Sequence, residues 1–213
     1  MSQLSDDLEA ISTRIRESFA AQDAAREKAL PLCREVIRFS SITIRAVHRH
    51  EFDEARDTLD EAGRLLREAE HHLTTCIELE NTRFVLDAQK EYAEAHATLA
   101  LTTGSRLPTP EEIKVEHSAY LNGLAEAASE LRRYLLDGLR GGDFHRGEEL
   151  LGAMDDIYSV LVTMDFPDSI TGGLRRSTDM LRGVMEKTRS DLTLSVEQNR
   201  LENKIDEFST KIK

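Results

Sequence analysis

The chain has 213 residues, a length that suits one domain with enough residues to bury a core. Hydrophobic residues make up 39% and charged residues 32%, a composition that excludes collagen-like, low-complexity and disordered chains. Acidic residues outnumber basic residues by 40 to 28, which gives a net charge of -12. Such a charge excludes a chain that attracts nucleic acid over its whole surface, so a polyanion would need a local basic patch.

The sequence predicts a protein of the reducing cytoplasm. No stretch approaches the roughly 20 apolar residues that a membrane span needs, so we expect no membrane partner. The first residues are acidic and amphipathic, unlike a signal peptide with its basic and then apolar run. The two cysteines, Cys33 and Cys76, lie in segments of helical pattern and make no disulfide framework.

Apolar residues recur with helical spacing along nearly the whole chain, and the alternating pattern of strands is absent. The pattern predicts an all-α protein, a single-domain bundle of about six or seven helices over residues 1–213. Glycine- and proline-containing breaks fall at residues 104–110 and 165–169. The predicted helices cover residues 4–50 with a bend near Pro31, 53–78, 82–103, 118–139, 146–163 and 172–208, with a short helical turn at 111–115.

The last predicted helix carries a narrow apolar seam on an otherwise charged surface. A seam of this width buries little within one chain, so it favours pairing with another chain. Packing on the helix's own bundle, or fraying in solvent, is the alternative. The seam consists of Leu174, Leu181, Met185, Leu192, Leu201, Ile205, Phe208 and Ile212.

Carboxylates follow the edge of the apolar stripe on the third and fourth long predicted helices. A helix advances about 100° per residue, so acids three or four positions apart project to the same side. Glu91 and Glu94 border the stripe of the third helix, and Glu126 and Glu130 border that of the fourth. If the two helices pack through their stripes, four carboxylates converge. Small residues that would allow a close approach are Gly123, Ala127 and Ala128.

Clustered carboxylates repel one another unless they share protons or hold a cation. An all-oxygen cluster favours a hard ion such as Mg²⁺ or Mn²⁺, which can activate water and neutralise phosphate charge during hydrolysis. Ordinary solvated acidic faces are the alternative, since 40 acids in 213 residues make such pairs frequent.

A basic face is predicted on the first helix. Arg34, Arg38, Arg45 and Arg49 fall within about a quarter-turn of one another. Five Lys/Arg and one acid between residues 28 and 50 give a local balance of +4 in a chain of net -12. Such a face suits a phosphate backbone and predicts salt-dependent binding. The alternative is ion pairing with acids of the next helix, namely Asp53, Glu54, Asp57, Asp60 and Glu61.

Three stretches resemble the family of translin and translin-associated factor X. The likeness covers roughly residues 23–193, and its most specific part is a Tyr-Leu-x-Gly start, a carboxylate, a Glu-Leu and a Gly-Asp turn. The stretches are DAAREKALPLCREVIRFSSITIRAVHR (residues 23–49), KEYAEA (90–95) and YLNGLAEAASELRRYLLDGLRGGDFHR (120–146).

The resemblance implies a seven-helix subunit that assembles into closed, commonly octameric shells enclosing RNA or single-stranded DNA. It also implies a Mg²⁺-dependent endoribonuclease site of the factor X type, made of acids on two helices. Its first acidic pair corresponds to Glu91 and Glu94, and its second to Glu126 and Glu130. At Glu126 the factor X branch usually has Asp, which is one methylene shorter. Translin proper lacks the complete acidic set, so this chain resembles the catalytic branch and its homo-oligomeric prokaryotic members.

The leading hypothesis is therefore a homo-octameric, Mg²⁺-dependent endoribonuclease acting on single-stranded RNA, with Mn²⁺ as the alternative ion. One alternative is a translin-like module that binds single-stranded RNA or DNA without chemistry, and another is a helical nucleotide pyrophosphohydrolase. The predicted metal ligands are Glu91, Glu94, Glu126 and Glu130, and the predicted backbone contacts are Arg34, Arg38, Arg45 and Arg49.

Overall fold

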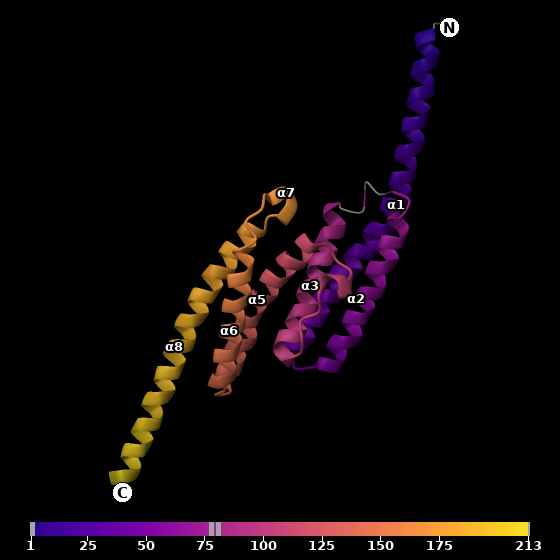
Figure 1. The fold of residues 1–213 in the computed structure, drawn as a ribbon. Coiled ribbons are helices and arrows are strands. Elements are labelled where there is room, and N and C mark those ends of the chain that lie inside the picture. Colours follow the sequence, from indigo (N-terminus) through magenta and orange to yellow (C-terminus); the bar gives the residue numbers. More distant parts are fainter. Residues whose placement is uncertain (1–2, 77–78, 80–81, 213) are drawn as a thin grey trace.

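The structure, a computed structural model, describes residues 3–76, 79 and 82–212. All regular elements in those residues are helices, which confirms the all-α class predicted from the sequence. None of the described helices has both the length and the apolar character needed to cross a membrane. The helices are α1 (Gln3–His48), α2 (Phe52–Leu73), α3 (Arg83–Thr103), α4 (Pro110–Ile113), α5 (His117–Arg140), α6 (Phe144–Leu161), α7 (Asp168–Thr171) and α8 (Leu174–Ile212) (Figure 1).

Most predicted helix ends lie within two residues of the observed ends, with three exceptions. Helix α2 ends at Leu73, five residues before its predicted end at residue 78, which lies outside the described residues. The short α7 begins inside the predicted break at residues 165–169 and ends just before the predicted start of the last helix at residue 172, and α8 extends four residues beyond residue 208. Helix α1 continues through Pro31, and Figure 1 shows its axis changing direction where it enters the bundle.

Local signals in the sequence explain the ends around the central helices. Gly104 adopts a left-handed conformation (φ 70°) after α3, and its N–H donates to the carbonyl of Ala100. Helix α5 ends at Arg140, before a pair of glycines. The carboxylate of Asp143 then caps α6 by accepting a hydrogen bond from the backbone N–H of Arg146 at 3.0 Å.

The core consists of two main clusters of buried apolar side chains. The first lies among α1, α2 and α3, and the second joins α5 with α6 and α8. Helix α3 packs against α5, and the half-buried side chain of Tyr120 contacts both clusters. The two groups of helices therefore meet through α3 and α5. The assignment of the whole chain to a single domain stays a prediction.

Gly123 lies where α5 crosses α3. A Cβ atom at this position would stand 2.6 Å from the carbonyl oxygen of Lys90 and 2.9 Å from the backbone nitrogen of Glu94. Real Cβ atoms do not come so close to backbone atoms, so the observed approach of the two helices requires glycine.

The outer ends of α1 and α8 extend beyond the bundle (Figure 1). On α8 the seam splits, since Leu174, Leu181, Met185 and Leu192 are buried within the chain's own core. For these four residues the alternative prediction, packing of the helix on its own bundle, is confirmed, and the favoured prediction of pairing with another chain is wrong. The structure does not describe the side chain of Ile212, the last residue of the predicted seam. The exposed apolar residues of the two ends are Leu4, Leu8, Ile11, Ile15 and Phe19 on α1, and Leu201, Ile205 and Phe208 on α8.

Candidate metal centre

Three of the four predicted metal ligands lie together where α3 packs against α5. Glu91 and Glu94 project from adjacent turns of α3, and Glu126 projects from α5, one turn after Gly123. One carboxylate oxygen from each residue lies within 4.8 Å of the other two. The spacing argument thus placed this part of the site correctly, although the role of these residues stays a prediction.

The innermost carboxylate is that of Glu94. Its residue is only 7% exposed, and none of the described residues donates a hydrogen bond to its side chain. Burial, together with the charges of Glu91, Glu126 and Glu130, raises the pKa of Glu94 to about 9. Burial also raises the pKa of Glu91, against the opposing effect of Lys90. The cluster therefore carries an energetic cost that a bound cation would relieve.

The structure adds a basic group that the spacing argument did not identify. The ammonium of Lys90 donates to Glu126 at 2.8 Å and forms an ion pair with Glu91 at 3.2 Å. Burial disfavours the charge of this lysine, but the hydrogen bond and charge of Glu126, with help from Glu91, raise its pKa. Lys90 thus lies charged between carboxylates of two helices.

Glu130, the fourth predicted ligand, lies outside this group of three. It lies one turn after Glu126 on α5, and its carboxylate accepts a hydrogen bond from Nε2 of His48 at 2.8 Å. That hydrogen bond lowers the pKa of Glu130, so the carboxylate is ionised and His48 is the donor. The side chain of His48 is 3% exposed and holds Glu130 in place.

The residues present fit a hard divalent cation. All three donors of the cluster are carboxylates, the ligand type that Mg²⁺ and Mn²⁺ prefer. The carboxyl group of Glu94 is buried without a hydrogen-bond donor among the described residues, and a cation bound there would stabilise its ionised form. The side chains of Glu91 and Glu126 are 24% and 38% exposed, so an ion would keep access to water and substrate.

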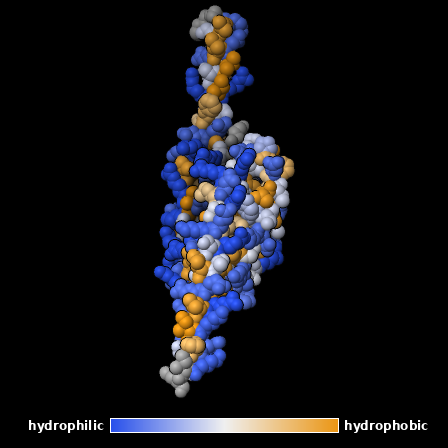
Figure 2. Space-filling view, turned by 90° about the vertical axis from the view of Figure 1, so that its left-hand side faces the viewer, coloured by the Kyte–Doolittle hydropathy of each residue, from blue (hydrophilic) through white to orange (hydrophobic). Residues whose placement is uncertain are grey.

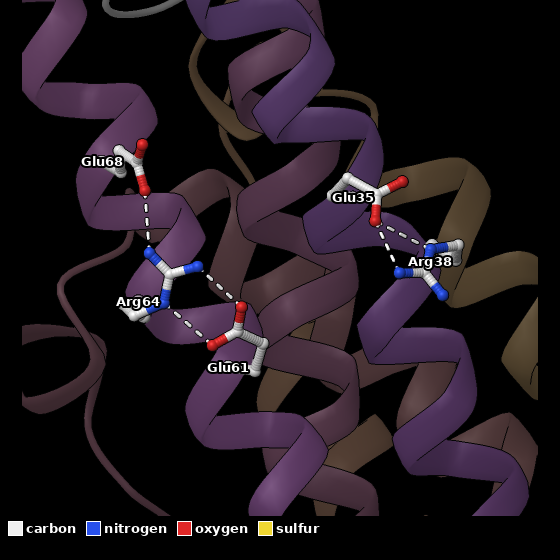
Figure 3. Close-up of polar contacts among 5 residues, drawn as sticks. All are labelled: Glu35, Arg38, Glu61, Arg64 and Glu68. Carbon is white, nitrogen blue, oxygen red and sulfur yellow. Dashed lines mark hydrogen bonds and ion pairs between the residues drawn. The ribbon is translucent and has the colours of Figure 1, made fainter.

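The predicted arginine face is exposed, but acids neutralise half of it. Arg38 donates from Nε and an Nη to the same carboxylate oxygen of Glu35, at 2.9 and 2.6 Å (Figure 3). Among the described residues, Arg34 and Arg45 form no ion pair. These two arginines are the members of the face that keep their charge available.

In the part of the chain that the structure describes, the expected pairing between α1 and the acids of α2 occurs at one point only. Arg49 pairs with Glu54, as well as with Glu51 in the connection between the helices. Glu61 is instead bound by Arg64 of its own helix, as Figure 3 shows. Pairing with α2 therefore explains Arg49 but not the other arginines.

The arginine face borders the side of α1 that reaches the carboxylates. Arg45 lies three residues before His48, which places their side chains about 60° apart around the helix axis. Because His48 contacts Glu130, a polyanion lying on Arg45 would lie beside the acidic cluster. Within the arginine face, Arg45 is thus placed near the acidic cluster, whereas Arg34 lies about three turns farther along α1.

We predict that Glu94→Gln stabilises the protein without metal, by about 4 kcal/mol at pH 8 and by less than about 1 kcal/mol at pH 5. In the unfolded chain this carboxyl ionises near 4.5, whereas in the fold its pKa is about 9. The folded state therefore binds the extra proton between these values, and Glu94 contributes progressively less to stability as pH rises through that window. Urea unfolding at the two pH values measures the difference.

Exposed Glu148→Gln on α6 is the control, and its stability should not change with pH in this way. The groups that face Glu94 are Lys90 and Glu91 of its own helix and Glu126 and Glu130 of α5. Equal effects of Glu94→Gln at pH 5 and pH 8 would contradict the raised pKa.

Known proteins resemble this chain over most of its length. No protein-family model matches the chain. An uncharacterized protein of Methanocaldococcus jannaschii, MJ0175, is 28% identical over 184 residues, which cover 85% of this chain and 81% of that protein. The crystal structure of apo-NeC3PO has a TM-score of 0.72 over 92% of this chain and 98% of that one, and its 18% identity supports the fold alone.

AfC3PO is more similar in sequence. It is 34% identical to this chain in two solved structures, its crystal structure and its complex with duplex RNA. The TM-scores are 0.76 and 0.77, and the matches cover 92% of this chain and 99% and 98% of the respective AfC3PO chains. The resemblance seen in the sequence is confirmed at this level of identity and coverage, and the chain belongs to the translin-like C3PO family.

Proposed function

We propose that the protein is a Mg²⁺-dependent endoribonuclease. The observation that carries the proposal is the convergence of Glu91, Glu94 and Glu126, whose ligand atoms lie within 4.8 Å of one another at the junction of α3 and α5. A bound divalent ion would lower the pKa of an attacking water and neutralise negative charge on the phosphate. Three carboxylates supply the negative charge that retains such an ion.

The residues of the site fall into metal ligands, a proton acceptor and a positioning residue in the proposal. Glu94, at the bottom of the cluster, and Glu91 and Glu126, nearer to solvent, hold the ion. Glu130 lies outside the group of three and would be the unligated carboxylate that accepts a proton from water, while its hydrogen bond from His48 keeps it ionised and lowers its strength as a base. His48 acts through Glu130 and is therefore a positioning residue.

The substrate proposed is RNA in a single-stranded region. Support for RNA comes from AfC3PO, which has been solved in complex with duplex RNA. On this chain, Arg34 and Arg45 would contact the phosphate backbone next to the carboxylates without reading its sequence. Strand preference is decided by comparing single-stranded and duplex RNA in the same assay.

We predict that Glu91→Gln and Glu126→Gln each slow Mg²⁺-dependent cleavage of single-stranded RNA by about a hundredfold or more. Each substitution keeps the size of the side chain but removes a charged ligand. Single-turnover cleavage of an end-labelled RNA, with and without Mg²⁺ or Mn²⁺, measures the effect.

As the control, the variant Glu148→Gln, which changes an exposed residue of α6, should cleave RNA at the rate of the unsubstituted protein. Normal cleavage by both ligand variants would remove these carboxylates from the active site. Salt-sensitive RNA binding with no product in any divalent ion would instead support the module that binds nucleic acid without chemistry.

We predict that the double variant Arg34→Gln/Arg45→Gln weakens RNA binding and flattens its salt dependence. Each lost contact to a single-stranded phosphate lowers the slope of log K against log salt by about 0.7, so the pair should lower it by about 1.4. Fluorescence anisotropy without divalent ions, over a range of salt, measures the slope. Arg38→Gln is the matched control, since Arg38 is already paired with Glu35 and should change the slope less.

We also propose that the chain forms a homo-octamer through the outer parts of α1 and α8. Figure 2 shows a line of apolar side chains along the protruding end of α1, where Leu4, Leu8 and Phe19 are 66%, 56% and 65% exposed. On α8, Ile205 and Phe208 are 54% and 66% exposed. Aligned apolar residues on protruding helices favour burial against another chain.

We predict that Leu8→Glu/Ile15→Glu, and separately Leu201→Glu/Ile205→Glu, reduce the mass of the assembly. Each pair places two charges in a seam that self-association would bury, while leaving the core of the subunit intact. Light scattering coupled to size exclusion measures the mass, which for the unsubstituted protein should equal eight chains. Ser190→Glu, at an exposed polar position of α8, should leave the mass unchanged.

A further inference from the structure

The ammonium of Lys90 lies against the proposed metal ligands. It is 2.8 Å from one carboxylate oxygen of Glu126 and 2.7 Å from the other. It also lies 3.2 Å from an oxygen of Glu91. A single positive charge therefore bridges α3 and α5 through two of the three carboxylates that converge there.

The lysine is fixed at this place by its position in the chain. It immediately precedes Glu91 on α3, and its backbone carbonyl lies at the close crossing with Gly123. Its side chain is only 24% exposed, the same fraction as that of Glu91. The ammonium of Lys90 therefore lies close to both Glu126 and solvent. The backbone of Lys90, by contrast, lies at the centre of the contact between the two helices.

We propose that Lys90 is a resident counter-cation that sets the metal affinity of the site, because a divalent ion must displace its ammonium from Glu126. The inference rests on the proposed function, since it takes the three carboxylates as metal ligands. In the absence of metal, the ammonium offsets the repulsion between Glu91 and Glu126. When metal binds, the positive charges of lysine and ion repel each other, so the lysine raises the metal concentration at which the site fills.

The test is a Mn²⁺ titration of the full-length chain and its Lys90→Met variant. Methionine keeps an unbranched side chain of similar length and removes the charge. We expect Lys90→Met to bind Mn²⁺ about tenfold more tightly, because a unit charge acts on the ion across only a few ångströms. Isothermal titration calorimetry and the electron paramagnetic resonance signal of free Mn²⁺ give the affinity without reference to RNA cleavage.

Thermal unfolding provides a second readout. Without metal, Lys90→Met should unfold at a lower temperature than the unsubstituted protein, and Mn²⁺ should raise its unfolding temperature by a larger amount. Lys90→Arg keeps the positive charge and should retain weak metal binding. Lys187→Met, at an exposed lysine of α8, removes the same charge away from the site and should bind Mn²⁺ as the unsubstituted chain does.

Equal or weaker Mn²⁺ binding by Lys90→Met would overturn the inference. If Lys90→Met does not fold, Lys90→Gln is titrated in its place under the same criterion. Failure of the proposed function gives a different result. In that case Mn²⁺ binds, Glu91→Gln abolishes the binding and Lys90→Met strengthens it, but no RNA is cleaved. Absence of Mn²⁺ binding in every variant would overturn both the metal centre and the role of Lys90.

Discussion

The close contact between α3 and α5 is the constraint on which the rest of the structure depends. At Gly123 the backbones approach so closely that a Cβ would stand 2.6 Å from a carbonyl oxygen of α3. The two groups of helices, with their separate apolar cores, meet through this pair of helices. The same contact brings Glu91 and Glu94 against Glu126. Packing and the proposed chemistry therefore share one interface.

The charges at this interface are balanced in a way that favours function over stability. Glu94 is buried beside other carboxylates, and its raised pKa of about 9 measures how strongly the fold disfavours its ionised form. Lys90 on one side neutralises part of the remaining charge, and on the other side the hydrogen bond from His48 stabilises the carboxylate of Glu130. A core built only for stability would place apolar side chains here, and the presence of acids instead is what the proposed binding role explains.

Helical periodicity was sufficient to predict the fold class, most helix ends and the convergence of three carboxylates. The sequence displays directly the angular spacing of residues along each helix and the glycine and proline breaks between helices, and the convergence follows when two helices pack through their apolar stripes. The partners of Glu126 and Glu130 depend on contacts between helices, since Lys90 and His48 lie 36 and 82 residues away from them in sequence. The end of α2 was also missed, because its helical pattern continues past Leu73. The pairing of Arg38 with Glu35, three residues apart, was within reach of the sequence.

Gly123 also shows that the presence of the ligands and their spacing are determined by different residues. A related chain with a larger residue at this crossing would keep every acid, yet its helices would stand farther apart. Its carboxylates would then span a gap too wide for one small ion. A comparison of the acidic residues alone would identify such a chain as active. The cause of its inactivity would be the larger residue at the helix crossing, which binds no ligand.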